Sequence, residues 1–268
     1  MQADLSWAFK GPGPYKWKAA GQSFEVRSPS PRQLEIMRKH VLTDTNIEEL
    51  RRYFTLLGVR EGQSLLDVGA NIGYMALAYS AALPGSEIVA FEPSDVNFEC
   101  LSFNTGQRRS ILPQKIGLHH ERSQASLRMP SGTQNSRASS KNYRNTGLFS
   151  MYGEGEEVSA AIELVTLDGW LETYSKRDQI GFAKIDVEGN ELNVLRGAKT
   201  FLSRQAPVLE VELNPDAPGS SRGVFLSTTA FLKDFGYRAF VAEKGHLTKL
   251  ESAPSGNVNA VFMKTNGV

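Results

Sequence analysis

The sequence of 268 residues predicts an α/β fold in which a mostly parallel sheet carries helices on both faces. Two observations support this prediction. Short apolar runs bounded by glycine, proline or acidic residues alternate with stretches of helical character along most of the chain. A strand, a tight glycine turn and a helix follow one another over residues 64–83, and the same order returns from residue 182. The length suits a single domain with additions.

Composition and charge argue against several classes of function. The chain has 30 Lys and Arg against 29 Asp and Glu, and the net charge of +1 gives no general field for holding a nucleic acid backbone. No apolar run approaches the roughly 20 residues that a membrane-spanning helix needs, and the first residues lack the features of a signal peptide. Cys100 stands alone and can form no disulfide within the chain. We therefore expect a cytoplasmic protein whose partners include neither nucleic acid nor membrane. The sequence gives no indication of the oligomeric state.

Residues 1–57 are expected to form an N-terminal arm and helices that pack on the core. Ser30 followed by Pro31 is typical of a helix N-cap and first turn. A second helix is expected to open at Thr45, because its spacing to Glu48 fits a capping box.

The main domain is expected over residues 58–268, beginning where Gly58 ends the second helix. Its strands are expected in the apolar runs near residues 64–68, 88–92, 111–118, 160–167, 182–186, 208–213, 237–242 and 259–264. Its helices are expected near residues 75–83, 94–104, 168–174, 191–202 and 224–235, with Asp168 as the cap of the third of these.

A polar insertion at about residues 120–158 interrupts this alternation, with many Ser, Asn and Arg residues and little apolar spacing. Long loops of this kind are usually functional lids or disordered segments, and the sequence does not decide between them. A sugar, a phosphate or single-stranded nucleic acid could bind its basic and aromatic residues, and the alternative is an ordinary solvated loop. These residues are Arg137, Lys141, Tyr143, Arg144 and Phe149.

The turn at residues 69–73 reads Gly-Ala-Asn-Ile-Gly and follows the first strand of the main domain. Gly69 and Gly73 allow close approach of a ligand, and the helix that follows offers free N–H groups to an anion. The turn lacks the middle glycine that admits a dinucleotide pyrophosphate. This difference disfavours a nicotinamide-dependent oxidoreductase.

Two acidic residues at strand ends sharpen the prediction of a ligand. Asp67 precedes the glycine turn by two residues and suits a ligand with a cationic amino group. Glu92 ends the second strand, where it can accept hydrogen bonds from both ribose hydroxyls. A carboxylate, an ammonium and a ribose together describe S-adenosylmethionine. The structural alternatives are turn glycines, a helix cap at Asp67 and a solvent-exposed strand end at Glu92.

Three carboxylates are candidates for catalysis: Asp186, Glu188 and Glu212, all at strand ends on the expected ligand side. On a continuing strand Asp186 and Glu188 would share one face, and Glu212 on the next strand could converge with them. Such a cluster can raise one pKa to make a general base, or hold a divalent cation. The alternatives are that Glu188 caps the next helix, and that Glu210 or Glu212 is a solvated edge charge.

Histidines offer a second choice of base. His119 and His120 follow the third strand, and histidine titrates near neutral pH. Adjacent histidines before a polar loop more often face solvent. The ligand spacing of a structural zinc site is absent from the sequence.

Four motifs, in this order, resemble the FkbM family of S-adenosylmethionine-dependent methyltransferases. They lie at residues 66–74, 91–93, 165–168 and 184–191, and the resemblance extends over about residues 58–213. It implies a class I methyltransferase fold with a seven-stranded sheet. It also implies O-methylation of a hydroxyl on a sugar, a polyketide or a related small metabolite, without naming the acceptor.

The resemblance also implies roles for individual residues. The methionine end of the cofactor would lie against Asp67, Gly69, Ala70, Asn71 and Gly73, with Glu92 on its ribose. Gly117 would leave room for the adenine, and Asp186 would face the methyl group.

Methylation of nucleic acid or protein is the alternative function within the same cofactor class. Enzymes that methylate amines in nucleic acid commonly carry an Asn/Asp-Pro-Pro-aromatic motif after the fourth strand, where this chain reads Asp-Val-Glu-Gly at residues 186–189. The sequence therefore favours a small-molecule hydroxyl as acceptor.

Overall fold

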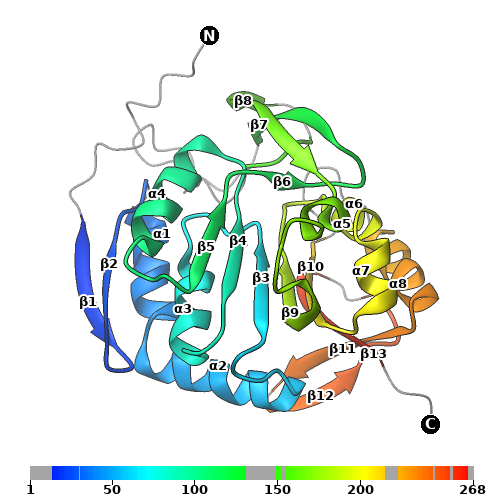
Figure 1. The fold of residues 1–268 in the computed structure, drawn as a ribbon, viewed down its shortest axis with the longest axis horizontal. Helices are drawn as coiled ribbons and strands as arrows, with labels where there is room; N and C mark the ends of the chain where they lie inside the picture. Colours follow the sequence, from blue (N-terminus) through cyan, green and yellow to red (C-terminus); the bar gives the residue numbers. More distant parts are fainter. Residues whose placement is uncertain are drawn as a thin grey trace.

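An eight-stranded mixed sheet and a smaller three-stranded sheet organise the residues that the structure describes (Figure 1). The computed structural model describes residues 14–29, 31–130, 149–152, 155–214, 223–243, 245–253 and 256–264. The main sheet has the strand order β12-β11-β13-β10-β9-β3-β4-β5. Its strands are β3 (Ser64–Val68), β4 (Ile88–Phe91), β5 (Ile111–Gln114), β9 (Ile180–Ile185), β10 (Val208–Leu213), β11 (Tyr237–Glu243), β12 (His246–Lys249) and β13 (Val258–Lys264).

The strand directions confirm the predicted fold class. Strands β5, β4, β3, β9 and β10 run parallel, whereas β13 is antiparallel to both β10 and β11. Seven of the strands correspond to expected ones, and β12 adds an eighth at the edge by pairing with β11. Because β3 lies between β4 and β9, the crossovers diverge there, and a crevice is expected beyond the carboxyl ends of these strands.

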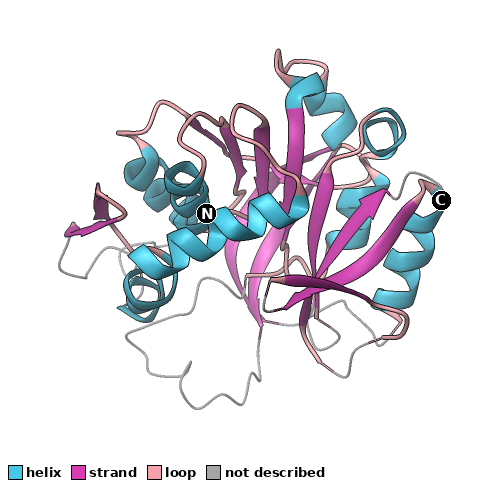
Figure 2. Cartoon of the chain, turned by 90° about the horizontal axis from the view of Figure 1, so that it is seen from below, coloured by secondary structure: helices cyan, strands magenta, loops and turns pink. Residues whose placement is uncertain are grey.

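Helices cover both faces of the main sheet (Figures 1 and 2). Successive strand residues point to opposite faces, so Leu65 packs in the apolar cluster on one side and Leu66 in the cluster on the other. The first cluster is completed by α2 (Asp44–Leu57), α3 (Tyr74–Ala82) and α4 (Asp95–Thr105). The second is completed by α5 (Leu167–Leu171), α6 (Glu191–Arg196), α7 (Lys199–Arg204) and α8 (Val224–Asp234). No helix in the described part of the chain is both long and apolar enough to cross a membrane.

The N-terminal part packs on the first of these faces. It contains β1 (Tyr15–Ala19), β2 (Gln22–Val26), α1 (Pro31–Ile36) and the π-helical turn η1 (Met37–Val41). The β1–β2 hairpin is attached by Trp17, whose indole N–H donates to the carbonyl of Leu42 at 3.1 Å. The predicted cap Ser30 lies outside the described residues. The division of the chain at residue 57 stays a prediction.

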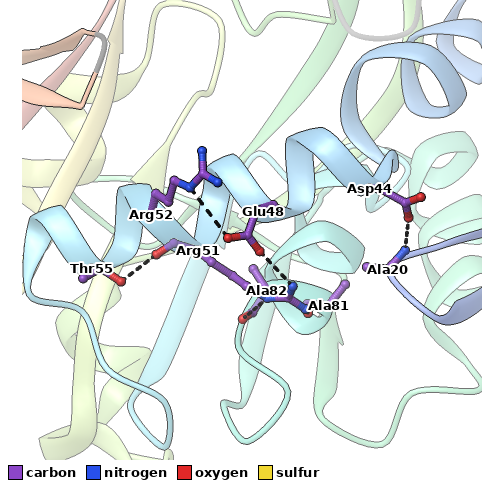
Figure 3. A network of polar contacts seen from close by, with 8 residues as sticks. All are labelled: Ala20, Asp44, Glu48, Arg51, Arg52, Thr55, Ala81 and Ala82. Carbon is purple, nitrogen blue, oxygen red and sulfur yellow. Dashed lines mark hydrogen bonds and ion pairs between the residues drawn. The ribbon is translucent and has the colours of Figure 1, made fainter.

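The N-cap of helix α2 lies two residues earlier than expected. Its N-cap is Thr43, whose hydroxyl accepts from the Asn46 N–H at 3.1 Å, so the capping box predicted at Thr45 is wrong. The end is as predicted, because Gly58 takes the left-handed conformation with φ of 70°. Glu48, the presumed partner of that box, instead pairs with arginines on its own helix (Figure 3).

Figure 3 also shows how α2 is attached to its neighbours. Arg51 donates to the carbonyls of Ala81 and Ala82 at the end of α3, at 3.1 and 3.4 Å. Asp44 accepts from the backbone of Ala20 in the β1–β2 turn. These contacts hold the N-terminal part against the first helix that follows the glycine turn.

The polar insertion contains more regular structure than the sequence indicated. β7 (Ser123–Pro130) pairs antiparallel with β8 (Gly155–Val165), and β6 (Gly117–Leu118) pairs with β8 on its other edge. This small sheet lies at the top of the molecule in Figure 1. The strand expected at residues 111–118 is thus divided between two sheets. Arg137, Lys141, Tyr143 and Arg144 lie outside the described residues.

The helix predicted at residues 191–202 is broken into α6 and α7. Gly197 stands at the break, where a Cβ would lie 2.0 Å from the carbonyl oxygen of His119. Asp168 does not cap its own helix, whose N-cap is Thr166. It accepts instead from the N–H groups of Thr200 and Phe201 in the first turn of α7.

Candidate active site

A cavity of about 620 Å³, including its open mouth, lies beyond the carboxyl ends of β3, β4 and β9. Five of the predicted cofactor residues line the cavity: Gly69, Asn71, Glu92, Gly117 and Asp186. Asp67, Ala70 and Gly73 are not part of its lining.

The glycine turn lies directly against the end of β9. Gly69 has φ of +86°, and a Cβ on it would lie 1.8 Å from the carbonyl oxygen of Asp186. Gly73 has the same φ, and a Cβ there would lie 2.6 Å from a methyl group of Leu101 in α4. Glycine at both positions therefore lets the turn fit between two elements of the core.

Asn71 connects the glycine turn to α1 and to the end of β4. Its φ is +53°, which is uncommon for a residue other than glycine. Its side-chain oxygen accepts from its neighbour Ile72 N–H at 2.7 Å and from the buried Gln33 of α1 at 3.1 Å. Its backbone N–H donates to Glu92 at 2.9 Å. The N-terminal part therefore contacts the glycine turn itself.

Glu92 is buried, with 6% of its surface exposed, and its carboxylate accepts from the N–H groups of Asn71 and Ser94, each at 2.9 Å. Burial raises its pKa to about 7, against the opposing effect of these hydrogen bonds. The structure therefore corrects the alternative of a solvent-exposed strand end.

The raised pKa of Glu92 predicts a pH dependence of stability. The unfolded carboxyl loses its proton near pH 4.3 and the folded one near pH 7, so stability falls as pH rises through this interval. We expect Glu92→Gln to remove this fall, changing the difference in unfolding free energy between about pH 5 and pH 8 by roughly 2 to 3 kcal/mol. Urea unfolding at both pH values measures it. Equal pH dependence in variant and wild type would contradict the prediction.

Behind the turn, three charged residues lie side by side on adjacent strands. Strand register pairs Asp67 with Lys184, and Lys184 with Glu210. Neither carboxylate oxygen of Asp67 makes a hydrogen bond with the described residues. Burial raises the pKa of Asp67 to about 6, although Lys184 acts in the opposite direction. Glu210 accepts from the hydroxyl of Tyr53, so it is not the solvated edge charge considered above.

Lys184 forms an ion pair with Asp186, with Nζ 2.5 Å from Oδ2. Burial disfavours the charge on Lys184, but Asp186 and Asp67 outweigh it and hold the pKa of Lys184 above its usual value. Burial likewise disfavours the charge on Asp186, but the ion pair lowers its pKa. Asp186 is therefore a fixed anion in the lining of the cavity.

Asp186, Glu188 and Glu212 converge as the sequence predicted, because one oxygen from each lies within 4.8 Å of the other two. Burial together with Asp186 raises the pKa of Glu188 to about 8 and that of Glu212 to about 7. The reason for convergence differs from the prediction: β9 ends at Ile185, and Glu188 reaches the cluster through a turn in which its φ is +52°.

Glu188 does not cap the following helix. The N-cap of that helix is Asn190, whose side chain makes no capping hydrogen bond, and the carboxylate of Glu191 accepts from the N–H groups of Val187 and Gly189 in the preceding turn at 3.2 and 3.0 Å. Glu188 lines the cavity beside Asp186, whereas Glu212 does not. Asn257 donates to Glu212 at 2.8 Å.

The histidine alternative is not supported by position. Neither His119 nor His120 lines the cavity. The Nδ1 atom of His119 is buried without a hydrogen bond to the described residues, and burial lowers the pKa of this side chain.

The profile of the methyltransferase FkbM domain matches residues 67–239, which is more than half of the chain. The chain belongs to this family. It is a methyltransferase of the class I fold, and the family implies S-adenosylmethionine as its cofactor. No curated protein matches the chain.

Solved structures show distant likenesses to this methyltransferase. A precorrin-6y C5,15-methyltransferase from Geobacter metallireducens is 11% identical, with 84% of this chain and 89% of that chain covered and a TM-score of 0.43. A SAM-dependent O-methyltransferase from Thermotoga maritima is 10% identical, with 97% and 80% covered and a TM-score of 0.43. At these scores the likenesses add no weight to an assignment of substrate.

Sequence reasoning missed several groups that shape the site of this methyltransferase. Lys184 begins the motif at residues 184–191, but its ion pair with Asp186 was not predicted. The signal was its position two residues before Asp186, which puts both side chains on one face of a strand. The apolar side of the cavity includes Leu127 of β7 and Ile162 of β8. No sequence signal marked these strands as part of the site.

Proposed function

We propose that this methyltransferase transfers the methyl group of S-adenosylmethionine to a hydroxyl of a small molecule. The observation that carries the proposal is the lining of one cavity by the glycine turn, Glu92, Asp186 and Glu188. The cofactor supplies a methyl group already activated by its sulfonium sulfur. The protein has to position the acceptor oxygen and take its proton.

The residues present fit this cofactor. Glu92 offers a carboxylate at the edge of the cavity for the ribose, and Gly69 and Asn71 would meet the methionine end. Asp67 does not line the cavity; its buried carboxylate lies behind the glycine turn beside Lys184, so it would favour a bound ammonium group only through its charge. Gly117 lines the cavity where the family resemblance puts the adenine.

Glu188 is our candidate for the general base. It lines the cavity, and its pKa is raised to about 8. A general base works best when its pKa lies near the working pH of the enzyme. Asp186, fixed by Lys184, would orient the acceptor hydroxyl toward the methyl group. As the acceptor oxygen bonds to the methyl carbon, the carbon–sulfur bond would break and release S-adenosylhomocysteine, and Glu188 would take the hydroxyl proton. Positioning of the acceptor oxygen can lower the barrier by about 7 to 11 kcal/mol. A general base can raise the rate by about 10² to 10⁴-fold.

Methyl-labelled S-adenosylmethionine tests the proposed acceptor class. The protein is incubated with mixed small hydroxyl compounds, with RNA and with unfolded protein, and products are identified by mass spectrometry. We expect label in O-methyl ethers of small molecules. Label confined to RNA or protein would contradict the proposal.

The carboxylate cluster also has the composition of a divalent cation site. Because Lys184 already pairs with Asp186 and the other two carboxyls can hold protons, we propose that transfer needs no metal. We expect excess EDTA to change the turnover rate by less than about twofold. A loss that Mg²⁺ restores would show that the cluster binds a metal instead.

A further inference from the structure

Residues 149–152 connect the small sheet to the loop that carries the acidic cluster. The backbone of Ser150 pairs with Arg128 of β7, through N–H to carbonyl distances of 2.8 and 3.0 Å. The hydroxyl of Ser150 donates to the carbonyl of Glu188 at 3.0 Å. Ser150 is 1% exposed, so both contacts are shielded from water.

Tyr152 makes the second connection to the same loop. Its hydroxyl donates to the side-chain oxygen of Asn190 at 3.0 Å and accepts from the amide of Asn193 at 2.9 Å. Asn190 in turn donates to the carbonyl of Leu118 in β6 at 3.1 Å. Residues 149–152 are therefore attached to the loop after β9 through both Ser150 and Tyr152.

The other two residues of the segment, Phe149 and Met151, line the cavity. Because Ser150 between them contacts the backbone carbonyl of Glu188, they flank the loop that carries Asp186 and Glu188 into the same cavity. Leu164, which belongs to the same apolar cluster as Phe149, also lines the cavity and lies against Gly117. Phe149 is firmly seated, with 8% of its surface exposed, in the apolar cluster of the small sheet.

We propose that Phe149 and Met151 form the wall of the acceptor subsite and determine its specificity. The acceptor then carries its hydroxyl on an apolar carbon skeleton that packs on these two side chains, and a polyol without an apolar face is a poor substrate. The inference rests on the proposed function, because it takes the part of the cavity lined by Asp186 and Glu188 as the place of methyl transfer.

A series of primary alcohols from ethanol to octanol tests the inference on the full-length protein. The protein is first titrated with S-adenosylhomocysteine, and the saturated complex is then titrated with each alcohol, with glycerol and with methyl glucoside, by ligand-observed NMR. Each methylene that packs on the wall should tighten binding about threefold to fourfold. Affinity that does not grow with chain length, or tighter binding of the polyols, would overturn the inference.

A matched pair of variants tests whether Met151 forms the surface on which the alcohol packs. Met151→Gln should weaken hexanol binding about fivefold or more while the affinity for S-adenosylhomocysteine changes less than twofold. Met129→Gln is the control, because Met129 packs against the same apolar cluster but does not line the cavity, and both affinities should stay at the wild-type value. Equal effects of the two variants on hexanol, or a larger effect of Met151→Gln on the cofactor product, would overturn the assignment.

The two proposals fail in distinguishable ways. Absence of S-adenosylhomocysteine binding in the folded wild-type protein contradicts the proposed function, and with it the inference. Normal binding of S-adenosylhomocysteine with an alcohol series of constant affinity contradicts the inference alone.

Discussion

Gly69→Ala is expected to destabilise the protein by more than about 4 kcal/mol and to abolish binding of S-adenosylmethionine. The added Cβ would lie 1.8 Å from the carbonyl oxygen of Asp186 and 2.9 Å from its carbonyl carbon. These are backbone atoms at the end of a central strand, so they cannot move aside as a flexible side chain would. Relief of the collision requires the glycine turn to separate from β9, which opens the cavity that both elements line.

Gly62→Ala is the matched control for this substitution. Gly62 has φ of +89°, close to the +86° of Gly69, but a Cβ there would meet no described atom within 4 Å. It therefore isolates the backbone penalty for alanine, which is about 1 to 2 kcal/mol. Denaturant unfolding of both variants gives the two free energies. A Gly69→Ala protein no less stable than Gly62→Ala would contradict the packing described for the turn.

Asp186→Ala is expected to eliminate methyl transfer and also to lower the unfolding free energy by about 3 to 5 kcal/mol. The second effect arises because Lys184, 7% exposed, would remain buried with its charge uncompensated by its partner at 2.5 Å. Loss of activity in this variant alone would therefore not separate a catalytic role from an unfolded site.

The double variant Lys184→Met, Asp186→Ala separates the two effects. At about pH 6, Asp67 can take up a proton once the lysine is gone, and burial also raises the pKa of Glu210, so neither carboxyl is left to replace the ion pair as a fixed buried charge. We expect most of the lost stability to return, as measured by urea unfolding, while transfer stays at least about 100-fold below wild type. If the double variant were as unstable as Asp186→Ala, the ion pair would not be the cause. If it recovered activity, Asp186 would have no part in transfer.

Local patterns were enough to predict the fold class. The apolar runs of the seven expected strands that belong to the main sheet each carry enough hydrophobic surface to specify burial without knowledge of their partners. Gly58 and the glycine turn are also local signals, since positive φ favours glycine in any context. The choice of Thr43 over Thr45 as a cap was not determined, because both residues are of a type that favours the position.

The parts of the site that sequence reasoning missed depend on contacts between distant residues. β7 carries Ser, Gln and Arg and becomes a strand only because β8 pairs with it across more than twenty residues of sequence. The row of Asp67, Lys184 and Glu210 requires the register of three strands. The position of Glu188 follows from a turn that alternation along a strand could not predict.

Calorimetric titration with S-adenosylmethionine, beside a titration with NAD, tests the central claim most directly. The account predicts saturable binding of S-adenosylmethionine at one site and no heat with NAD. It also predicts that Glu92→Ala weakens the binding by about tenfold or more, since two ribose hydrogen bonds would be lost. Binding of NAD, or no heat from S-adenosylmethionine with a folded protein, would contradict the account.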